Sequence, residues 1–188
     1  MSTSTQHPVY DPVARLLHWS IALLWIAVFV MGVLAVYGRD MLNPHHELTI
    51  AHKAIASAML ALIALRVVWR LTHRPPPLAE TMSPLMQRAA HAGHGAIYAL
   101  ALIGLPLSGW MWSSVADKPI MVLWLVKLPP LVAPAKEWYD LAKLVHVSIA
   151  WTAGALIAGH VLMALKHHFV DKDHTLRTML PAVRAKSQ

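Results

Sequence analysis

The sequence predicts an all-α integral membrane protein, a four-helix bundle with both termini in the cytoplasm. Of its 188 residues, 57% are hydrophobic and only 13% are charged, which is outside the usual range of soluble domains. A helix needs roughly 20 apolar residues to cross a bilayer core. Four stretches reach that length: Leu16–Val36, Leu48–Trp69, Ala89–Trp112 and Leu141–Leu165.

Local signals set the expected helix boundaries. Asp11-Pro12, Asn43-Pro44 and Ser83-Pro84 each combine an N-cap residue with proline at the first helical position. A single domain over residues 1–188 follows, with helices at about 12–37, 44–71, 84–112 and 137–168. The run Pro75-Pro76-Pro77 ends the second helix. Met121–Leu125 is expected to lie at the membrane interface.

The basic residues predict the orientation. The net charge of +7 does not indicate nucleic-acid binding, because the basic residues flank the apolar stretches. The side predicted to be cytoplasmic carries Arg15, Arg66, Arg70, Arg74, Arg88, Lys166, Lys172, Arg177, Arg184 and Lys186. The opposite side carries Arg39, Lys118, Lys127, Lys136 and Lys143. The first stretch lacks a signal-peptide pattern and is expected to stay as an anchor in the lipid bilayer.

The absence of cysteine restricts the chemistry of any cofactor site. It excludes disulfides, iron–sulfur clusters, thiolate metal sites and covalent c-type haem attachment. Histidine, methionine and oxygen ligands remain.

Histidines inside the apolar stretches are the main candidate site residues. Ionisable side chains are costly in a hydrocarbon core and are functional candidates by default, and His18, His52, His146 and His160 all lie there. His146 and His160 are fourteen residues apart, so they share one helix face about 21 Å apart along the axis. The predicted topology pairs His18 with His160 on the cytoplasmic side and His52 with His146 on the outer side. Two pairs at two depths suit two b-type haems per chain, each iron taking one imidazole above and one below.

Other residues are candidates for the surroundings of these sites. His91 and His94 begin the third helix on one side of it and are rivals for the cytoplasmic site; we expect them to line a haem or quinone. His167 and His168 could contact a quinone or a haem propionate. Three cations near the predicted haem edges are candidate propionate partners: Arg15, Lys53 and Arg66. Small residues on the fourth helix are expected to leave room for a flat ring: Ala150, Ala153, Gly154, Ala158 and Gly159.

The motifs that carry these residues resemble the bacterial cytochrome b561 family, which includes the cytochrome b subunits of nickel–iron hydrogenases. The resemblance covers nearly the whole chain. It rests on Arg15-Leu16-Leu17-His18-Trp19, Ala51-His52-Lys53, His91-Ala92-Gly93-His94 with Tyr98, His146 and His160, and the closing Lys166-His167-His168-Phe169, Asp171-Lys172-Asp173 and Leu176-Arg177-Thr178-Met179-Leu180-Pro181.

The resemblance implies a two-haem b-type cytochrome of the bacterial inner membrane that exchanges electrons with membrane quinone. It carries the four ligand roles onto His18, His52, His146 and His160. The expected donor is periplasmic superoxide or a redox partner protein, with electrons entering at the outer pair and leaving near the inner pair. One alternative is a haem-bearing anchor subunit of a hydrogenase-like enzyme. Another is a histidine-lined metal or proton transporter, which the lack of aspartate and glutamate in the four stretches disfavours.

Overall fold

The computed structural model describes residues 9–77 and 82–180 of the chain. Four of its helical segments are long and apolar enough to cross a membrane: Pro12–Tyr37, Glu47–Thr72, Pro84–Val115 and Lys136–Phe169. The elements within the described residues are α1 (Pro12–Tyr37), α2 (Arg39–Leu42), α3 (Glu47–Thr72), α4 (Pro84–Ile97), η1 (Tyr98–Gly104), α5 (Leu105–Val115), β1 (Ile120–Val122), β2 (Val126–Leu128), η2 (Lys136–Trp138), α6 (Tyr139–Phe169) and α7 (Thr175–Met179).

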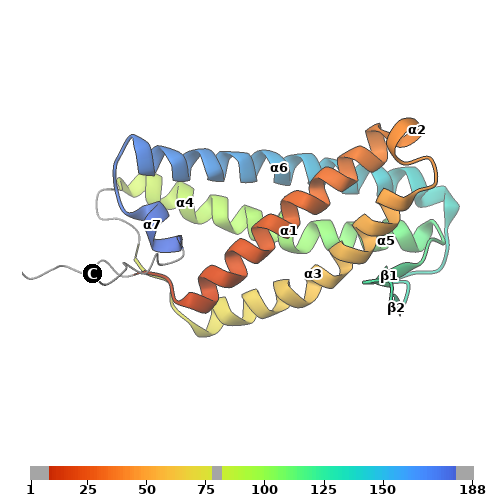
Figure 1. Cartoon of the computed structure of the whole chain (residues 1–188), viewed down its shortest axis with the longest axis horizontal. Helices are drawn as coiled ribbons and strands as arrows, with labels where there is room; N and C mark the ends of the chain where they lie inside the picture. Colours follow the sequence, from red (N-terminus) through yellow and green to blue (C-terminus); the bar gives the residue numbers. More distant parts are fainter. Residues whose placement is uncertain (1–8, 78–81, 181–188) are drawn as a thin grey trace, which may run out of the picture.

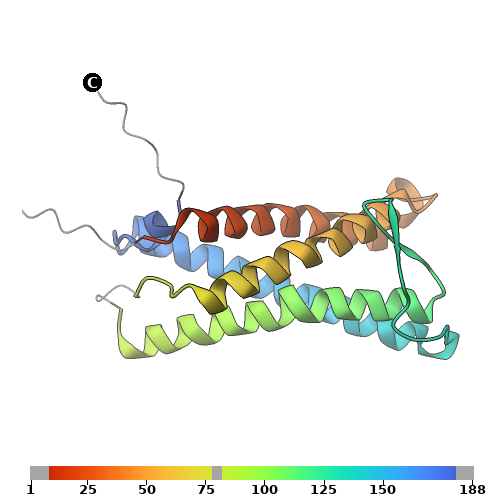
Figure 2. The same cartoon turned by 90° about the horizontal axis from the view of Figure 1, so that it is seen from below.

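The long helices run side by side along one axis (Figures 1 and 2). At one end of the bundle α1 begins, α3 ends, α4 begins and α6 ends beside α7; we call this the terminal end (Figure 1). At the other end lie α2 and the β1–β2 hairpin, and we call it the hairpin end. The larger set of basic residues therefore gathers at the terminal end, except that Arg184 and Lys186 lie outside the described residues.

Two helix starts match the capping chemistry of the sequence. Asp11 precedes α1, and its carboxylate accepts a hydrogen bond from the Ala14 N–H at 2.8 Å. Ser83 precedes α4, and its hydroxyl accepts from the Met86 N–H at 3.3 Å. Both helices carry proline in their first turn, where no partner for its missing N–H is needed. The predicted starts at residues 12 and 84 are confirmed.

The predicted start of the second long helix at Asn43-Pro44 is wrong. α3 begins at Glu47, after His46 in a left-handed conformation with φ of 65°. The Asn43 side chain is fully buried, at 0% exposure, where it donates to Thr49 Oγ1 at 2.9 Å and accepts from the Leu48 N–H at 3.0 Å. Asn43 lies before α3, and its side chain provides an acceptor for a backbone N–H in the first turn of that helix. The short helix α2 separates the end of α1 from the start of α3.

The third membrane-crossing segment changes its helical register at its middle. Between α4 and α5 the residues of η1 form a π-helix, and the Leu105 N–H reaches back five residues to the Leu100 carbonyl. Pro106 follows directly, and because proline has no N–H to donate, the ordinary spacing of helical hydrogen bonds is interrupted there. The wide turn shifts which side chains of α5 face the bundle interior.

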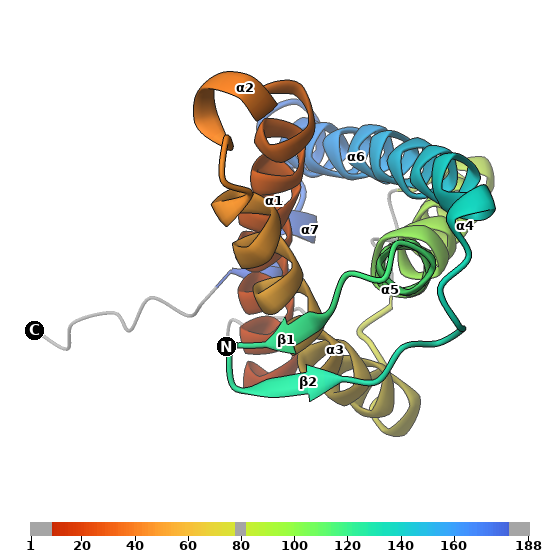
Figure 3. The same cartoon turned by 90° about the vertical axis from the view of Figure 1, so that its right-hand side faces the viewer.

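The segment between α5 and α6 is a β-hairpin, which adds a small sheet to the predicted all-α fold. β1 and β2 pair antiparallel, with Ile120 opposite Leu128 and Val122 opposite Val126. The hairpin lies against α3, where the Leu123 N–H donates to the Ala54 carbonyl at 3.2 Å (Figure 3). Leu125 at its tip is 80% exposed, as suits an apolar residue placed in the headgroup region.

The bundle core lies between the two levels of histidines. α1 packs along α3, and α5 packs along α6. The buried cluster combines Ile21, Trp25 and Val28 of α1 with Met59 of α3 and Ala153 of α6. Many large apolar side chains point outward, such as Leu23 at 65% exposure. An exposed apolar surface of this extent needs lipid around it.

We predict that Asn43→Ala destabilises the hairpin end of the bundle. The substitution leaves the Thr49 hydroxyl and the Leu48 N–H without their buried partner, a loss of about 1–3 kcal/mol. Thermal unfolding of the detergent-solubilised protein, followed by circular dichroism, measures the effect. An unchanged midpoint in the alanine variant would contradict this role.

Candidate functional site

The structure brings the four intramembrane histidines together in two pairs. Near the hairpin end, His52 of α3 faces His146 of α6, with ring centroids 6.4 Å apart and planes at 85°. Near the terminal end, His18 of α1 faces His160 of α6, with centroids 6.3 Å apart and planes at 68°. Each pair therefore joins two helices that are distant in sequence, and α6 contributes one imidazole to each level.

A cavity of about 250 Å³ lies around the hairpin-end pair. It is lined mainly by α1, α3, α5 and α6, and the imidazoles of His52 and His146 both line it. Most of its wall is apolar, with Trp25, Phe29 and Trp151 among the aromatic residues. Such a cavity, with a few converging polar groups, is typical of a site for a large planar cofactor.

Hydrogen bonds fix the orientation of both imidazoles in this cavity. His52 Nδ1 donates to the Val28 carbonyl at 2.8 Å, since a carbonyl can only accept. His146 Nδ1 lies 3.0 Å from the Ser108 hydroxyl, whose own proton is directed to the Leu105 carbonyl at 3.1 Å. Both rings therefore carry their proton on Nδ1, and Nε2 keeps its lone pair for a metal.

The distances between the paired rings fit bis-imidazole coordination of one metal ion. A metal–imidazole bond of about 2 Å, with the ring centre about 1.1 Å behind the nitrogen, separates two facing centroids by about 6.2 Å. The observed separations are 6.3 and 6.4 Å. The cavity also holds a buried donor without an acceptor, the indole N–H of Trp112, whose ring lies 5.8 Å from that of His146. A haem fits these groups, because it offers an iron to the imidazoles and carboxylates to such a donor.

Comparison with known proteins decides the family. A profile of prokaryotic cytochrome b561 matches residues 9–182. The chain belongs to the prokaryotic cytochrome b561 family. It is 34% identical over 180 residues to cytochrome b561 homolog 2 of Escherichia coli (strain K12), covering 96% of this chain and 95% of that protein.

Two further relatives are similar to this cytochrome. A Yersinia pestis protein named probable superoxide oxidase CybB is 29% identical over 178 residues, covering 95% of this chain and 99% of that one. Cytochrome b561 homolog 1 of Escherichia coli (strain K12) is 35% identical over 114 residues, covering 57% of each. Membership of this family makes the chain a multi-pass bacterial membrane cytochrome that binds b-type haem and serves electron transport.

The terminal-end site of this cytochrome contains a third imidazole. The His94 ring of α4 lies 5.1 Å from that of His160, closer than the ring of His18. His94 Nδ1 donates to the Ala90 carbonyl at 2.7 Å, so its Nε2 is also free to accept or to ligate. His91 is exposed and is oriented in the same way, by the Gln87 carbonyl at 2.7 Å. The rivalry predicted between His94 and His18 therefore persists in the structure.

The three cations proposed for the propionates have partners within the protein. Arg15 Nη1 donates to the Leu180 carbonyl at 2.9 Å, while its buried Nε has no acceptor. Lys53 Nζ donates to the Pro119 carbonyl at 2.9 Å and also lines the cavity. Arg66 Nη1 donates to the Ala14 carbonyl at 3.1 Å, and its guanidinium lies 5.9 Å from the centre of the Tyr98 ring. Arg15 and Lys53 thus hold chain segments at opposite ends of the bundle.

The sequence predicted that the small residues of α6 leave room for a flat ring, but only some of them face open space in the structure. Ala153 is in the buried core, and a Cβ on Gly154 would lie 3.1 Å from Phe29. Gly159 does face open space. Sequence reasoning missed two other glycines, Gly32 and Gly109, which lie directly against the imidazoles of His52 and His146.

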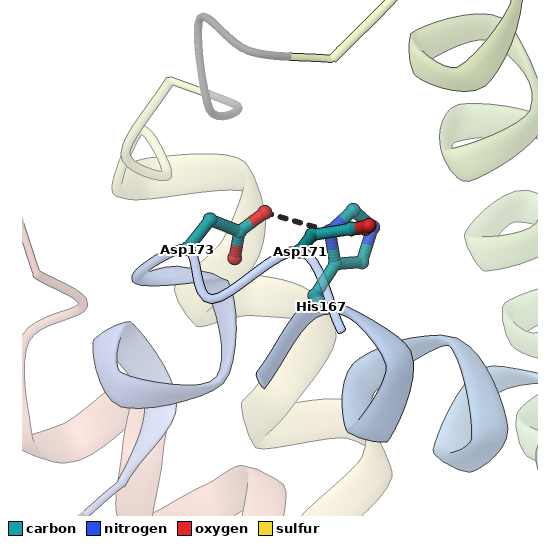
Figure 4. Close-up of side chains that lie close together, drawn as sticks. All are labelled: His167, Asp171 and Asp173. Carbon is teal, nitrogen blue, oxygen red and sulfur yellow. Dashed lines mark hydrogen bonds and ion pairs between the residues drawn. The ribbon is translucent and has the colours of Figure 1, made fainter. Parts of the chain in front are cut away.

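The segment that follows α6 is held against the end of that helix by a cluster of three residues, His167, Asp171 and Asp173 (Figure 4). His167 Nδ1 lies 2.7 Å from an Asp173 carboxylate oxygen and 3.2 Å from one of Asp171. Lys166 also binds Asp171, at 2.6 Å. Among residues 9–77 and 82–180 these three are the only group of three or more histidine and acidic side chains whose ligand atoms all lie within 4.8 Å of one another, and their hydrogen bonds already account for the spacing. The cluster positions α7 beside the start of α1, where the Trp19 indole donates to the Met179 carbonyl at 2.9 Å.

We predict that this fastening loosens in acid. Burial opposes ionisation of Asp173, but hydrogen bonds from Thr175 and His167 outweigh it and lower the pKa of the carboxyl below its ordinary 3.8. A depressed pKa stabilises the folded form above pH 3.8, and this contribution is lost as the pH falls through the lower folded value. Limited proteolysis of the segment that follows α6 should therefore become faster as the pH falls below 3.8.

Asp173→Asn should show the faster cleavage already at neutral pH, because the carboxylate is absent at every pH. The control is Asp140→Asn, at an exposed position at the start of α6. Equal cleavage of Asp173→Asn and the unsubstituted protein at pH 7 would contradict the fastening role.

Proposed function

We propose that this chain is a di-haem cytochrome of the bacterial inner membrane that passes electrons between a donor and the quinone pool. His52 and His146 would hold the haem near the hairpin end, and His18 and His160 the haem near the terminal end. The observation that carries the proposal is that both pairs have ring separations, 6.4 and 6.3 Å, suited to one iron between two imidazoles.

A haem held between two histidines would supply single-electron transfer and would not bind oxygen, because its iron would have no free coordination position. The protein orients the ligands of the hairpin-end site through the Val28 carbonyl and the Ser108 hydroxyl. The walls of the cavity are mostly apolar and offer few partners to water. The Trp112 N–H is a donor suited to a haem carboxylate.

Periplasmic superoxide is the donor that we favour. The name of the Yersinia pestis relative, which matches 95% of this chain, supports it. In the balanced reaction, two superoxide anions become two molecules of oxygen while one quinone takes up the two electrons and two protons to become quinol. The basic side chains of the hairpin-end segments, at Arg39, Lys118, Lys127, Lys136 and Lys143, would favour the approach of an anion.

We place the quinone near the terminal end, within the predicted cytoplasmic half. His94 and His168 support this placement: the His94 ring lies 5.1 Å from that of His160, and the buried Nδ1 of His168 has no partner among the described residues. A quinone carbonyl can accept from the Nδ1–H of His168, and the Nε2 lone pair of His94 can accept from the hydroxyl of a quinol. The positive-inside distribution of basic residues supports the matching orientation, with both termini in the cytoplasm.

A haem-bearing anchor subunit of a larger redox enzyme is the second candidate. The family includes such subunits by resemblance, but the relatives that match this chain end to end carry the names of cytochromes b561 and a superoxide oxidase. We therefore favour a cytochrome that acts without a partner enzyme. Purification separates the two candidates, because an anchor should bring a partner subunit with it.

The haem content of single variants tests the ligand assignment. We expect purified protein to show low-spin b-type absorption bands after dithionite reduction, with a pyridine haemochrome ratio of about two haems per chain. His146→Ala should lose the hairpin-end haem and His160→Ala the terminal-end haem, because each substitution removes one of the two imidazoles assigned to that iron. His45→Ala, at an exposed position outside the long helices, is the control. Retention of both haems in His146→Ala and His160→Ala would refute the assignment.

A separate experiment tests the donor. Protein reconstituted with ubiquinone in liposomes should form quinol when superoxide is generated enzymatically, and raised salt should slow the reaction by screening the basic residues. Catalase added throughout excludes hydrogen peroxide as the reductant. No haem reduction at all would remove superoxide as the donor, and haem reduction without quinol formation would remove quinone as the acceptor.

A further inference from the structure

Two glycines on different helices share the same relation to the two histidines of the hairpin-end site. A Cβ built on Gly32 of α1 would lie 3.0 Å from Cε1 of His52. A Cβ built on Gly109 of α5 would lie 3.0 Å from Cε1 of His146. Carbon atoms in ordinary contact are about 3.5–4.0 Å apart, so neither position accepts a side chain unless the imidazole moves.

Each glycine also lies one helical turn after the carbonyl that orients its imidazole. In an α-helix the carbonyl of residue i accepts from the N–H of residue i+4. Val28 and Gly32 have this spacing on α1, and Leu105 and Gly109 have it on α5. Because glycine has no side chain, the carbonyl four residues before it remains accessible to a side chain from a neighbouring helix. His52 bonds the Val28 carbonyl directly, at 2.8 Å, and His146 reaches that of Leu105 through the Ser108 hydroxyl.

The other glycines of the long helices do not repeat this arrangement. A Cβ on Gly154 would meet Phe29 at 3.1 Å, and a Cβ on Gly104 would meet the Ala99 carbonyl at 3.2 Å. Gly93, Gly95 and Gly159 have open space at that position. Within the described residues, contact of a glycine with an imidazole is thus confined to His52 and His146, and the two lie in one site.

We propose that Gly32 and Gly109 are positioning residues for the hairpin-end haem. Each lets a ligand imidazole lie against the neighbouring helix, where the Val28 carbonyl accepts the Nδ1 proton of His52 and the Ser108 hydroxyl accepts that of His146, so that Nε2 would be directed toward the iron. The inference rests on the proposed function, because it concerns the two histidines assigned there as ligands. It adds α1 and α5 to that site, although neither contributes a ligand to it.

A comparison of alanine variants tests the proposal. Loss of an outer hydrogen-bond partner of a metal ligand costs about 10- to 100-fold in metal affinity, and we expect Gly32→Ala and Gly109→Ala to weaken the hairpin-end haem by that order. The measurement is transfer of haem from the purified holoprotein to apomyoglobin, which should become faster for one haem and stay unchanged for the other. The low-spin ferric signal in electron paramagnetic resonance should shift for the same haem, because it reports how the two imidazole planes are oriented.

Two control variants separate positioning from packing. Gly154→Ala introduces similar crowding, against Phe29 in place of an imidazole, and should lower thermal stability without a shift in either haem signal. Gly95→Ala, on α4, enters open space and should shift neither haem signal. Ser108→Ala removes the hydroxyl between His146 and the Leu105 carbonyl without crowding the ring, and should shift the same haem signal as Gly109→Ala.

The outcomes also separate this inference from the proposed function. If His52→Ala removes one haem while Gly32→Ala and Gly109→Ala leave both haem signals and transfer rates unchanged, the positioning role is wrong and the ligand assignment stands. If His52→Ala keeps both haems, the ligand assignment itself fails. Equal loss of both haems, or loss of folded protein, in both glycine variants would assign these residues to general packing and overturn the inference.

Discussion

An imidazole in the apolar interior of a membrane bundle is costly unless its ring nitrogens find partners. The arrangement of this protein follows from how four such imidazoles are satisfied. In the hairpin-end pair, Nδ1 of each ring has a protein partner on a neighbouring helix, while Nε2 remains for a ligand. The core between the two levels is filled by apolar side chains, such as Trp25 and Met59, which need no such partners. The intramembrane histidines, whose ring nitrogens need partners, are thus gathered at two levels of the bundle.

The same constraint explains why helices without a ligand still shape the hairpin-end site. α1 offers the Val28 carbonyl to His52, and α5 offers Ser108 to His146. The π-helical turn before Pro106 sets the face that α5 presents. At the terminal end, the residues at and after the end of α7 pack against α1, because Arg15 and Trp19 donate to the carbonyls of Leu180 and Met179. Arg15, which was predicted to lie at a haem edge, therefore also binds the segment that follows α7.

Much of the fold could be predicted because its signals are local. The length of apolar stretches, and an N-cap followed by proline, fix most helices of a membrane bundle before any contact between helices is considered. Asn43-Pro44 carries the same local signal, yet the helix begins at Glu47. The buried Asn43 is used by contacts with Thr49 and Leu48, which no capping rule includes. The hairpin was missed because its run Met121–Leu125 is short, and short apolar runs fit several structures equally well.

The site was predictable to the extent that topology decides it. The order of the helices brings His18 to His160 and His52 to His146, and the structure has both pairs in contact. The roles of Gly32, Gly109 and Ser108 depend on which side chain of another helix lies opposite, and a single sequence does not contain that information. His94 illustrates the same limit, because its 5.1 Å approach to His160 depends on how α4 packs against α6.

The most direct test of the account is to locate the iron. Diffraction from crystals of the purified protein at the iron absorption edge gives an anomalous difference map that shows iron independently of any assumed ligand. We predict two peaks, one between His52 and His146 and one between His18 and His160. A peak ligated by other side chains, or the absence of iron from either level, would contradict it.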